Sequence, residues 1–296
     1  MTEQTLYLGM TRADLDFQYN NRERVPNHAE IYAGWGPACV KVTKDFDCKL
    51  DVAYGDHGRE KLDIFLPDRN RHGDGPFPIR LFFHGGFWMS RDKEDSRFVV
   101  RGQVDAGAVV ISAEYALIPA VDMTELLRQC RAAVTWAWHN AASFNGDPDR
   151  LYVSGHSAGG HIAAMLQATD WTEWGLPADA VKGAAALSGI FDLTPMRNCY
   201  IDDTLHLSED DVRRYSPEHL PPRGGGSTLI AVGGAETAEF LRQSQALAAA
   251  WAGKTAEVEL LEVPGANHFT ILDHYAGPDS DLCRAMIRQM GLGDAL

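Results

Sequence analysis

The chain has 296 residues, of which 45% are apolar, and a formal net charge of −14. This length is sufficient for a large hydrophobic core, and the apolar content is ordinary for a globular protein. The negative charge disfavours binding to nucleic-acid phosphates or to an anionic membrane surface, and no basic run offsets it.

Targeting signals and cysteine spacing restrict the class of protein further. The start of the chain lacks the positive and apolar segments of a signal peptide, and no apolar run is long enough to cross a bilayer. We therefore expect a cytoplasmic protein that binds neither membranes nor nucleic acids. The five cysteines are scattered and never spaced as C-x-x-C, so neither a disulfide framework nor a zinc site is indicated. The oligomeric state is open, and a homodimer is one option.

The N-terminal part of the chain, residues 1–45, contains no long apolar run. Between Leu15 and Trp35, aromatic and charged residues occur at loosely helical spacing, which is typical of an arm that lies over the body of a protein. Two short alternating runs follow, 50–54 and 62–66, with a glycine-containing turn between them. This pattern predicts an antiparallel pair of strands.

From residue 79 onward, short apolar runs alternate with helical patterns. The runs are typical of buried strands and cover 79–83, 109–113, 151–153, 181–187, 228–232 and 258–263. The helical patterns cover 123–142, 161–168, 239–251 and 281–290. This alternation predicts a mostly parallel sheet with helices on both faces, within one α/β domain that spans 1–296. Functional sites of such sheets collect at the carboxyl ends of the strands.

The segment 192–226 does not follow the alternation. It is polar and rich in proline, and it contains the glycine run 224–226. An insert of this length between two core strands exceeds an ordinary connection, so we expect a cap or lid over the site.

The stretch Gly155–Gly159 reads G-H-S-A-G and fits the G-x-S-x-G pattern. The bare pattern occurs by chance in many chains, but here an apolar run precedes it and a helical pattern follows. Small residues on either side of Ser157 allow a sharp strand-to-helix turn that holds its hydroxyl above the sheet edge. The start of the helix favours negative charge on a substrate oxygen. Ser157 is therefore the predicted nucleophile.

A serine nucleophile needs a base, and the base needs an acid that fixes its tautomer. Among eleven histidines, His268 directly follows the last predicted strand and is the predicted base. Glu236 follows the strand 228–232 and gives the order serine, acid, histidine that is preferred for this kind of turn. Asp192 is the rival, either as the acid or as the N-cap of the next helix, and Glu236 is preferred over it.

The strand 79–83 is followed by His84-Gly85-Gly86-Phe87-Trp88. A glycine pair directly after a strand lets backbone N–H groups turn inward, toward the negative oxygen of a tetrahedral intermediate. The predicted oxyanion hole consists of the N–H groups of Gly86 and Phe87, together with that of Ala158 after the nucleophile.

The substrate pocket is less well defined by the sequence. Trp88 and His156 are candidates for its lining, and a packing role is the alternative for each. Arg22, Arg24 and Arg197 are candidates for holding a substrate carboxylate, and the sequence does not choose between them.

These motifs resemble the α/β-hydrolase superfamily, and within it the branch of hormone-sensitive-lipase-like esterases and kynurenine (aryl) formamidases. The H-G-G-x-W form at 84–88 is more similar to the formamidases than to the lipase-like esterases, which usually carry H-G-G-G. Further matching pieces are G-H-S-A-G-G-H at 155–161, E-x-x-E-F-x-x-Q-S at 236–244, N-H-F at 267–269, and Y-N-x-R at 19–22 with Val25-Pro26. The resemblance therefore covers most of the chain.

The resemblance implies the triad Ser157, Glu236 and His268, with oxyanion donors at Gly86 and Phe87. It also implies a cofactor-independent serine hydrolase, with no metal, that cleaves a small formamide such as an N-formyl aryl compound. One departure is that the formamidases carry aspartate where Glu236 stands. A short-chain carboxylesterase is the alternative, because the motifs do not separate esters from amides. An inactive hydrolase fold used for binding is a third hypothesis.

Overall fold

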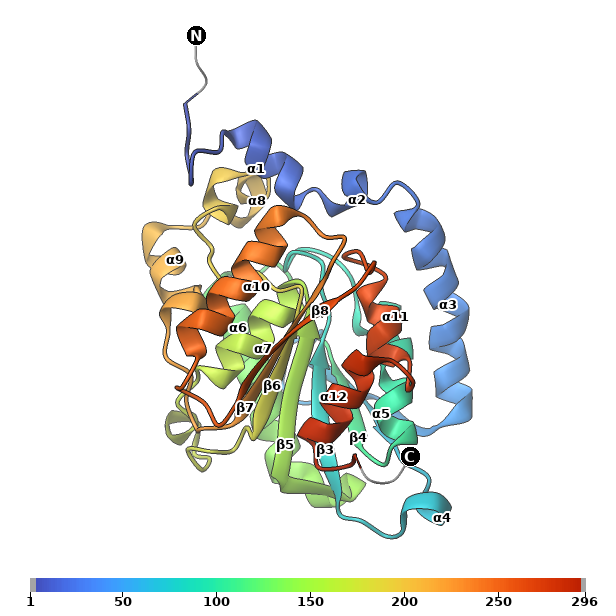
Figure 1. Ribbon diagram of the computed structural model, residues 1–296. Helices are drawn as coiled ribbons and strands as arrows, with labels where there is room; N and C mark the ends of the chain where they lie inside the picture. Colours follow the sequence, from blue (N-terminus) through green and yellow to red (C-terminus); the bar gives the residue numbers. More distant parts are fainter. Residues whose placement is uncertain (1–3, 294–296) are drawn as a thin grey trace.

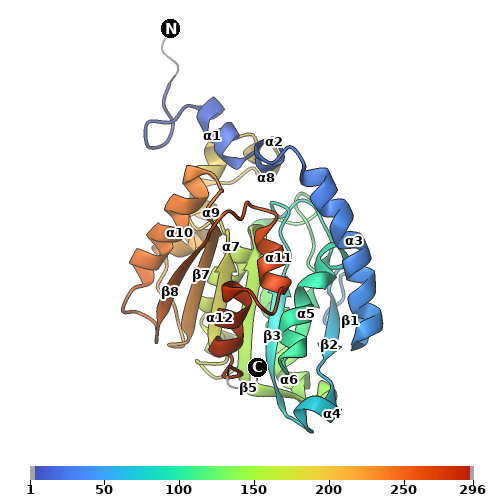
Figure 2. The same ribbon diagram turned by 45° about the vertical axis from the view of Figure 1, so that its right-hand side comes forward.

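The computed structural model describes residues 4–293, and eight strands of this part form one sheet. The strand order is β1-β2-β4-β3-β5-β6-β7-β8. The pairs β1–β2 and β2–β4 are antiparallel, and the remaining neighbours are parallel. Figures 1 and 2 show this twisted sheet with helices packed on both of its faces. The predicted α/β fold with an antiparallel start is confirmed.

The strands are β1 (Asp47–Ala53), β2 (Lys61–Leu66), β3 (Phe77–Phe83), β4 (Val109–Ala113), β5 (Gly146–His156), β6 (Gly183–Leu187), β7 (Ser227–Gly233) and β8 (Val258–Val263). The α-helices are α1 (Arg12–Tyr19), α2 (Asn21–Arg24), α3 (His28–Asp45), α4 (Arg69–His72), α5 (Arg101–Asp105), α6 (Met123–Asn140), α7 (Ala158–Gln167), α8 (Asp202–Leu205), α9 (Glu209–Tyr215), α10 (Ala238–Trp251), α11 (Ile271–Ala276) and α12 (Asp281–Gln289). Short 3-10 helices occur at η1 (Lys93–Val100), η2 (Ala141–Phe144), η3 (Trp171–Trp174), η4 (Met196–Asn198) and η5 (Pro217–His219).

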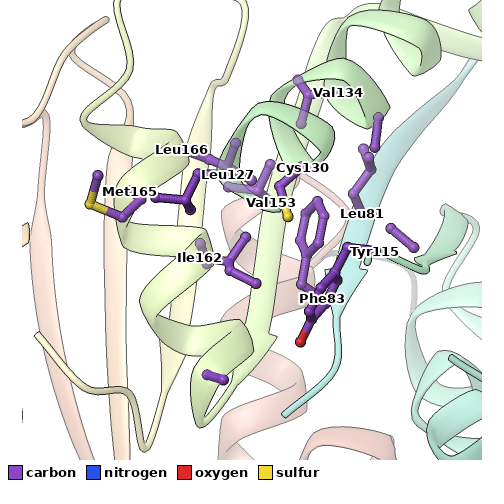
Figure 3. Close-up of a cluster of buried hydrophobic side chains, with 14 of the residues drawn as sticks. Leu81, Phe83, Tyr115, Leu127, Cys130, Val134, Val153, Ile162, Met165 and Leu166 are labelled. Carbon is purple, nitrogen blue, oxygen red and sulfur yellow. The ribbon is translucent and has the colours of Figure 1, made fainter. Parts of the chain in front are cut away.

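The buried strand β3 shows why both faces of the sheet are covered. Side chains alternate along a strand, so Ile79, Leu81 and Phe83 belong to the core on one face and Phe82 to the core on the other. The first core lies under α6 and α7. Figure 3 shows part of it, with the labelled residues Leu81, Phe83, Tyr115, Leu127, Cys130, Val134, Val153, Ile162, Met165 and Leu166.

The second core lies under α3, α5, α11 and α12. Helix α3 is 18 residues long, although the sequence patterns indicated no helix beyond Trp35. Gly34, Gly36 and Pro37 are poor helix formers and hide its periodicity. The helix forms because tertiary packing overrides propensity: Trp35 stacks on Phe98 at 5.1 Å between ring centroids.

The N-terminal helices and the segment 192–226 lie next to each other. Arg12 pairs with Asp203 at 2.8 Å, and the N–H of Tyr200 donates to the carboxylate of Asp16 at 2.6 Å. Figures 1 and 2 both show α1, α2 and α8 together at the top of the molecule. Within residues 4–293, no helix has the length and apolar character needed to cross a membrane.

The turn from β5 to α7 is packed against the end of β3 without room for side chains. A Cβ on Gly155 would lie 2.1 Å from the carbonyl oxygen of Gly159. A Cβ on Gly159 would lie 1.9 Å from the carbonyl oxygen of Phe83. Both contacts are impossible for any residue except glycine, so these two positions determine how closely the turn approaches the strand.

We expect Gly159→Ala to destabilise the fold by roughly 1–3 kcal/mol or more, because backbone must move to admit the methyl group. Gly34→Ala is the matched control, since a Cβ there meets nothing within 4 Å. The exposed helical position should become more stable by roughly 0.5–1 kcal/mol. Urea unfolding of both variants measures the effects, and a Gly159→Ala variant as stable as the parent would contradict the packing argument.

Candidate active site

Ser157 lies between β5 and α7 in a strained backbone conformation. Its φ is +58° and its ψ is −119°, a region that non-glycine residues rarely adopt. The conformation is held by the N–H of Ser157, which donates to the carbonyl of Leu187 at 2.9 Å. The residue is almost fully buried and lines a cavity.

His268 lies in the loop between β8 and α11, and its ring contacts both other predicted residues. Nε2 is 3.0 Å from the hydroxyl oxygen of Ser157, and Nδ1 is 2.7 Å from a carboxylate oxygen of Glu236. Because a carboxylate only accepts, Nδ1–H donates to Glu236 and Nε2 is free to accept from the serine hydroxyl. The structure thus brings Ser157, His268 and Glu236 into one hydrogen-bonded chain.

The carboxylate of Glu236 is fully buried and bonded through both oxygens. Oε1 accepts from the N–H of Gly233 at 2.8 Å and from the hydroxyl of Ser188. Oε2 accepts from His268. A carboxylate held this way has one orientation, which in turn fixes the tautomer and the angle of the imidazole.

Asp192, the rival acid, points elsewhere. Its Oδ2 accepts from the hydroxyl of Tyr7 at 2.8 Å, and its Oδ1 accepts from the N–H of Thr194 at 2.8 Å. Its own N–H donates to the side-chain oxygen of Gln243. Asp192 therefore ties the N-terminal arm and the segment 192–226 to α10, and it makes no hydrogen bond to His268.

The backbone after β3 forms a tight loop beside the turn that carries Ser157. Gly86 has a φ of +114°, and a Cβ there would lie 2.2 Å from the carbonyl oxygen of Ser90. Gly86 and Phe87 line the same cavity as Ser157, and within residues 4–293 no protein group accepts from their N–H groups. Ala158 is the first residue of α7, so its N–H has no partner inside the helix either.

A buried carboxylate, Glu114, anchors this loop. The ring of His84 stacks on Tyr115 at 4.4 Å, and its Nε2 donates to Glu114 at 2.9 Å. Arg59 donates to the same carboxylate at 2.6 Å. Burial alone would raise the pKa of Glu114, but the hydrogen bond and charge of His84, with Arg59, lower it below the usual value. The carboxylate is therefore ionised and anchors the loop.

The sequence analysis missed Ser188 and Glu114. A usable signal was present, because Ser188 directly follows β6 and Glu114 directly follows β4. Polar residues at the carboxyl ends of parallel strands meet at one edge of the sheet. At this edge, the sequence motifs indicated only the residues that belong to a known pattern.

Of the two predicted pocket residues, one lines the cavity and the other does not. Trp88 is fully buried and packs edge-on against His161, with 5.0 Å between ring centroids, which corresponds to the packing alternative. His156 lines the cavity, and its Nε2 donates to the backbone carbonyl of His268 at 2.7 Å. Burial holds the pKa of His156 well below its ordinary value, so the ring is neutral and braces the loop that carries His268.

The cavity above Ser157 has a volume of about 530 Å³. The body of the protein supplies Ser157, His268 and the loop after β3, while the N-terminal arm and the segment 192–226 supply the outer wall. The outer residues are Asn20, Asn21, Arg22, Tyr32, Trp35, Tyr200 and Thr204. Within residues 4–293, no group of three or more His, Cys, Asp or Glu side chains is arranged to hold a metal ion.

The three arginines named from the sequence are now distinguished. Arg22 lines the cavity. Arg24 lies over the ring of Phe17, 4.1 Å from its centroid. Arg197 pairs with Glu209 at 3.3 Å. Neither of these two arginines lines the cavity. Arg91 also lines the cavity and was not recognised from the sequence.

The sheet and the strand-turn-helix serine define the α/β-hydrolase class, and residues 62–212 match the BD-FAE family. A kynurenine formamidase of Danio rerio is 31% identical over 247 residues, which cover 82% of each chain. A kynurenine formamidase of Salmo salar is 32% identical over 248 residues, with the same coverage. The crystal structure of a protein assigned as a thioesterase, from Silicibacter sp. TM1040, superposes with a TM-score of 0.78 at 28% identity. It covers 91% of this chain and 97% of that one.

The chain belongs to the BD-FAE family of α/β-hydrolases, in the branch of kynurenine formamidases and hormone-sensitive-lipase-like esterases. It is a hydrolase of an amide or ester bond. The resemblance drawn from the motifs is confirmed.

The buried side chain of His161, one turn after Ser157, should make the free energy of unfolding depend on pH. Its Nε2 donates to the carbonyl of Tyr215, and burial lowers the pKa of His161 to about 4. In the unfolded chain this imidazole binds a proton near pH 6.5, whereas in the folded chain it stays neutral down to about pH 4. The free energy of unfolding should therefore fall as the pH drops from about 6.5 to about 4, by up to about 3 kcal/mol from this group. Urea unfolding at pH 7 and pH 4.5 measures the loss.

His161→Gln is the control for that measurement, because an amide keeps an N–H donor and does not titrate. The loss of stability between the two pH values should be smaller in this variant. An equal loss in both proteins would show that other groups cause it.

Proposed function

We propose that the chain is a serine hydrolase that cleaves a small formamide, with Ser157, His268 and Glu236 as the catalytic triad. The observation that carries the proposal is the unbroken hydrogen-bonded chain, 3.0 Å from serine to imidazole and 2.7 Å from imidazole to carboxylate. The formamidases that match over 82% of the chain support the choice of an amide.

The reaction follows from the direction of these hydrogen bonds. The oxygen of Ser157 attacks the formyl carbon while Nε2 of His268 takes the serine proton. The negative oxygen of the tetrahedral intermediate accepts from the N–H groups of Gly86, Phe87 and Ala158. Nε2 then returns the proton to the leaving nitrogen, and the C–N bond breaks. Water, activated by the same imidazole, releases formate from the serine.

Glutamate at position 236 suits this role although the formamidases carry aspartate there. Its longer side chain is kept in place by the N–H of Gly233 and the hydroxyl of Ser188. Because the carboxylate is buried and fully bonded, it stabilises the imidazolium without taking its proton.

We further infer that the chain is one domain in which the N-terminal arm, 1–45, and the segment 192–226 together act as a small cap. Contacts between Arg12 and Asp203, and between Tyr7 and Asp192, support this, since they join the arm to the segment above the cavity. The cap separates substrate recognition from the chemistry, which lies in the body of the protein.

We expect Ser157→Ala to reduce turnover of the best substrate by about 10⁴-fold or more, because it removes the attacking atom. The parent protein should be labelled at Ser157 by a fluorophosphonate, detected by mass spectrometry. A folded parent that does not react would favour the hypothesis of an inactive hydrolase fold.

The assignment of the acid has its own test. Glu236→Gln should lower kcat by about 10³- to 10⁴-fold, because an amide cannot stabilise the imidazolium. Asp192→Asn is the matched control and should lower kcat far less, since Asp192 does not bond to the imidazole. The acid would be reassigned if the two losses were reversed.

Ester hydrolysis is the second candidate, because identical groups cleave both bonds and ester hydrolases are among the relatives. Amides need protonation of a poor leaving group, and in the proposed mechanism His268 supplies that proton. We expect a higher kcat/KM on N-formylkynurenine than on p-nitrophenyl acetate. Rates that favour the acetate would make the chain a carboxylesterase with the same triad.

A further inference from the structure

Two motifs found in the sequence meet at the junction between the N-terminal arm and α10. Tyr19 of the Y-N-x-R motif contacts Phe240 and Gln243 of the E-x-x-E-F-x-x-Q-S motif. Of these two motifs the proposed chemistry uses only Glu236. We propose that Tyr19 and Gln243 are positioning residues that keep the proposed triad in its productive orientation. The inference deepens the proposed function and rests on the proposed triad, but not on the choice of substrate.

One path of support runs through aromatic rings. Tyr19 is fully buried, although it belongs to the N-terminal arm. Its ring packs edge-on against Phe240, with 5.7 Å between ring centroids, and Phe240 contacts the imidazole of His268 at 4.6 Å. Helix α1 lies next to α10 in both Figures 1 and 2. A side chain in a close-packed core cannot tilt unless its neighbours move, so Tyr19 limits the tilt of the imidazole through Phe240.

The hydroxyl of Tyr19 both donates and accepts a hydrogen bond. It donates to the carboxylate of Glu239 at 3.0 Å and accepts from the side-chain N–H of Gln243 at 2.7 Å. Burial, followed by the charge of Glu239, raises the pKa of Tyr19 well above its ordinary value, so the phenol stays protonated. Removal of this one oxygen therefore leaves a buried amide N–H without its partner.

The amide of Gln243 carries the second path of support. Its oxygen accepts from the N–H groups of Phe191 and Asp192, at 2.6 and 2.9 Å, in the loop after β6. Because the oxygen is occupied by these two donors, only the NH2 group can face the arm, which defines the orientation of the amide. The same loop begins with Ser188, whose hydroxyl donates to Glu236. Gln243 therefore fixes the loop that supplies a hydrogen bond to the proposed acid.

The arm also contacts the turn that carries Glu236. The backbone carbonyl of Gln18 accepts from the hydroxyl of Thr237 at 2.9 Å, and its side-chain oxygen accepts from the N–H of Glu239 at 3.2 Å. The N–H of Glu239 lies in the first turn of α10, where a helix offers it no internal partner. Gln18 therefore caps α10 and holds the residues that directly follow the proposed acid. The arm supports the proposed chemistry in addition to forming a wall of the cavity.

The test measures how fast Ser157 reacts with diisopropyl fluorophosphate, since this rate reports activation of the serine without involving a formamide. Tyr19→Phe keeps the ring contact and removes only the hydroxyl. We expect the labelling rate constant of the folded protein to fall about five- to tenfold in Tyr19→Phe and further in Gln243→Met, which also frees the loop after β6. The double variant should be slower than Gln243→Met by no more than about twofold, because both changes break the same bond.

Tyr7→Phe is the matched control, because it removes a hydroxyl from the same arm. The hydroxyl of Tyr7 bonds to Asp192 and Arg242 at the outer end of the network, at 2.8 and 3.0 Å. This variant should keep the labelling rate of the parent. Tyr19→Phe should also lower kcat on the best substrate at unchanged KM, whereas loss of a cavity wall alone would raise KM. Urea unfolding gives the folded fraction of each variant.

Two results would overturn the positioning roles. One is a labelling rate in Tyr19→Phe equal to that in Tyr7→Phe, with only the free energy of unfolding reduced, since the bonds of Tyr19 would then stabilise the fold and nothing more. The other is a pair of losses in Tyr19→Phe and Gln243→Met that multiply in the double variant, which would mean that the two side chains act independently.

Proton NMR separates failure of the positioning roles from failure of the proposed reaction. The Nδ1–H proton of His268 gives a low-field signal, identified by its absence in His268→Ala, that reports the hydrogen bond to Glu236. A signal that is shifted or broadened in Tyr19→Phe but not in Tyr7→Phe supports the positioning roles even if the parent is never labelled, and in that case only the proposed reaction is wrong. Spectra that are identical in the parent and in Tyr19→Phe overturn the positioning roles, whatever the protein hydrolyses.

Discussion

The site depends on one close contact between backbones, where the turn from β5 to α7 touches the end of β3. With Gly159 against the carbonyl of Phe83, the turn that carries Ser157 and the loop that carries Gly86 share one rim. A single methyl group at this contact would move the hydroxyl of Ser157 away from the backbone of Gly86 and Phe87. The proposed acyl transfer tolerates errors of only about an ångström, so under that proposal the glycine is required for the chemistry as well as for the packing.

Two buried carboxylates hold the parts around that contact. Glu236 is hydrogen-bonded to the imidazole of His268, and Glu114 is hydrogen-bonded to the imidazole of His84 in the loop after β3. A buried carboxylate is stable only when its oxygens are bonded, and each of these accepts from several donors. Both therefore have a single orientation. The groups that would stabilise a developing charge are in place beforehand, which is where most of the catalytic effect of such sites arises.

The outer wall of the cavity has a different origin from its floor. The floor consists of strand ends of the sheet, whereas the wall comes from α2, α3 and the segment 192–226. The wall is attached by side-chain pairs such as Arg12–Asp203 and by aromatic contacts such as Tyr32–Phe269. With the proposed triad in the floor, one arrangement of this kind can serve ester or amide hydrolysis. The wall can change while the floor keeps its geometry.

Features that depend on neighbouring residues were predictable from the sequence. They are the strand-helix alternation, the turn at Ser157 and the glycines after β3, because local sterics and the period of the side chains determine them. Position at a strand end also selected His268 and Glu236. Arg91, Ser188 and the full length of α3 were not predictable, since each depends on partners distant in the chain. Cytoplasmic location and oligomeric state stay predictions. Sequence alone determined which groups the chain possesses and near which strand each lies. Only the tertiary structure decided which of them touch, because packing, not spacing, sets distances between remote segments.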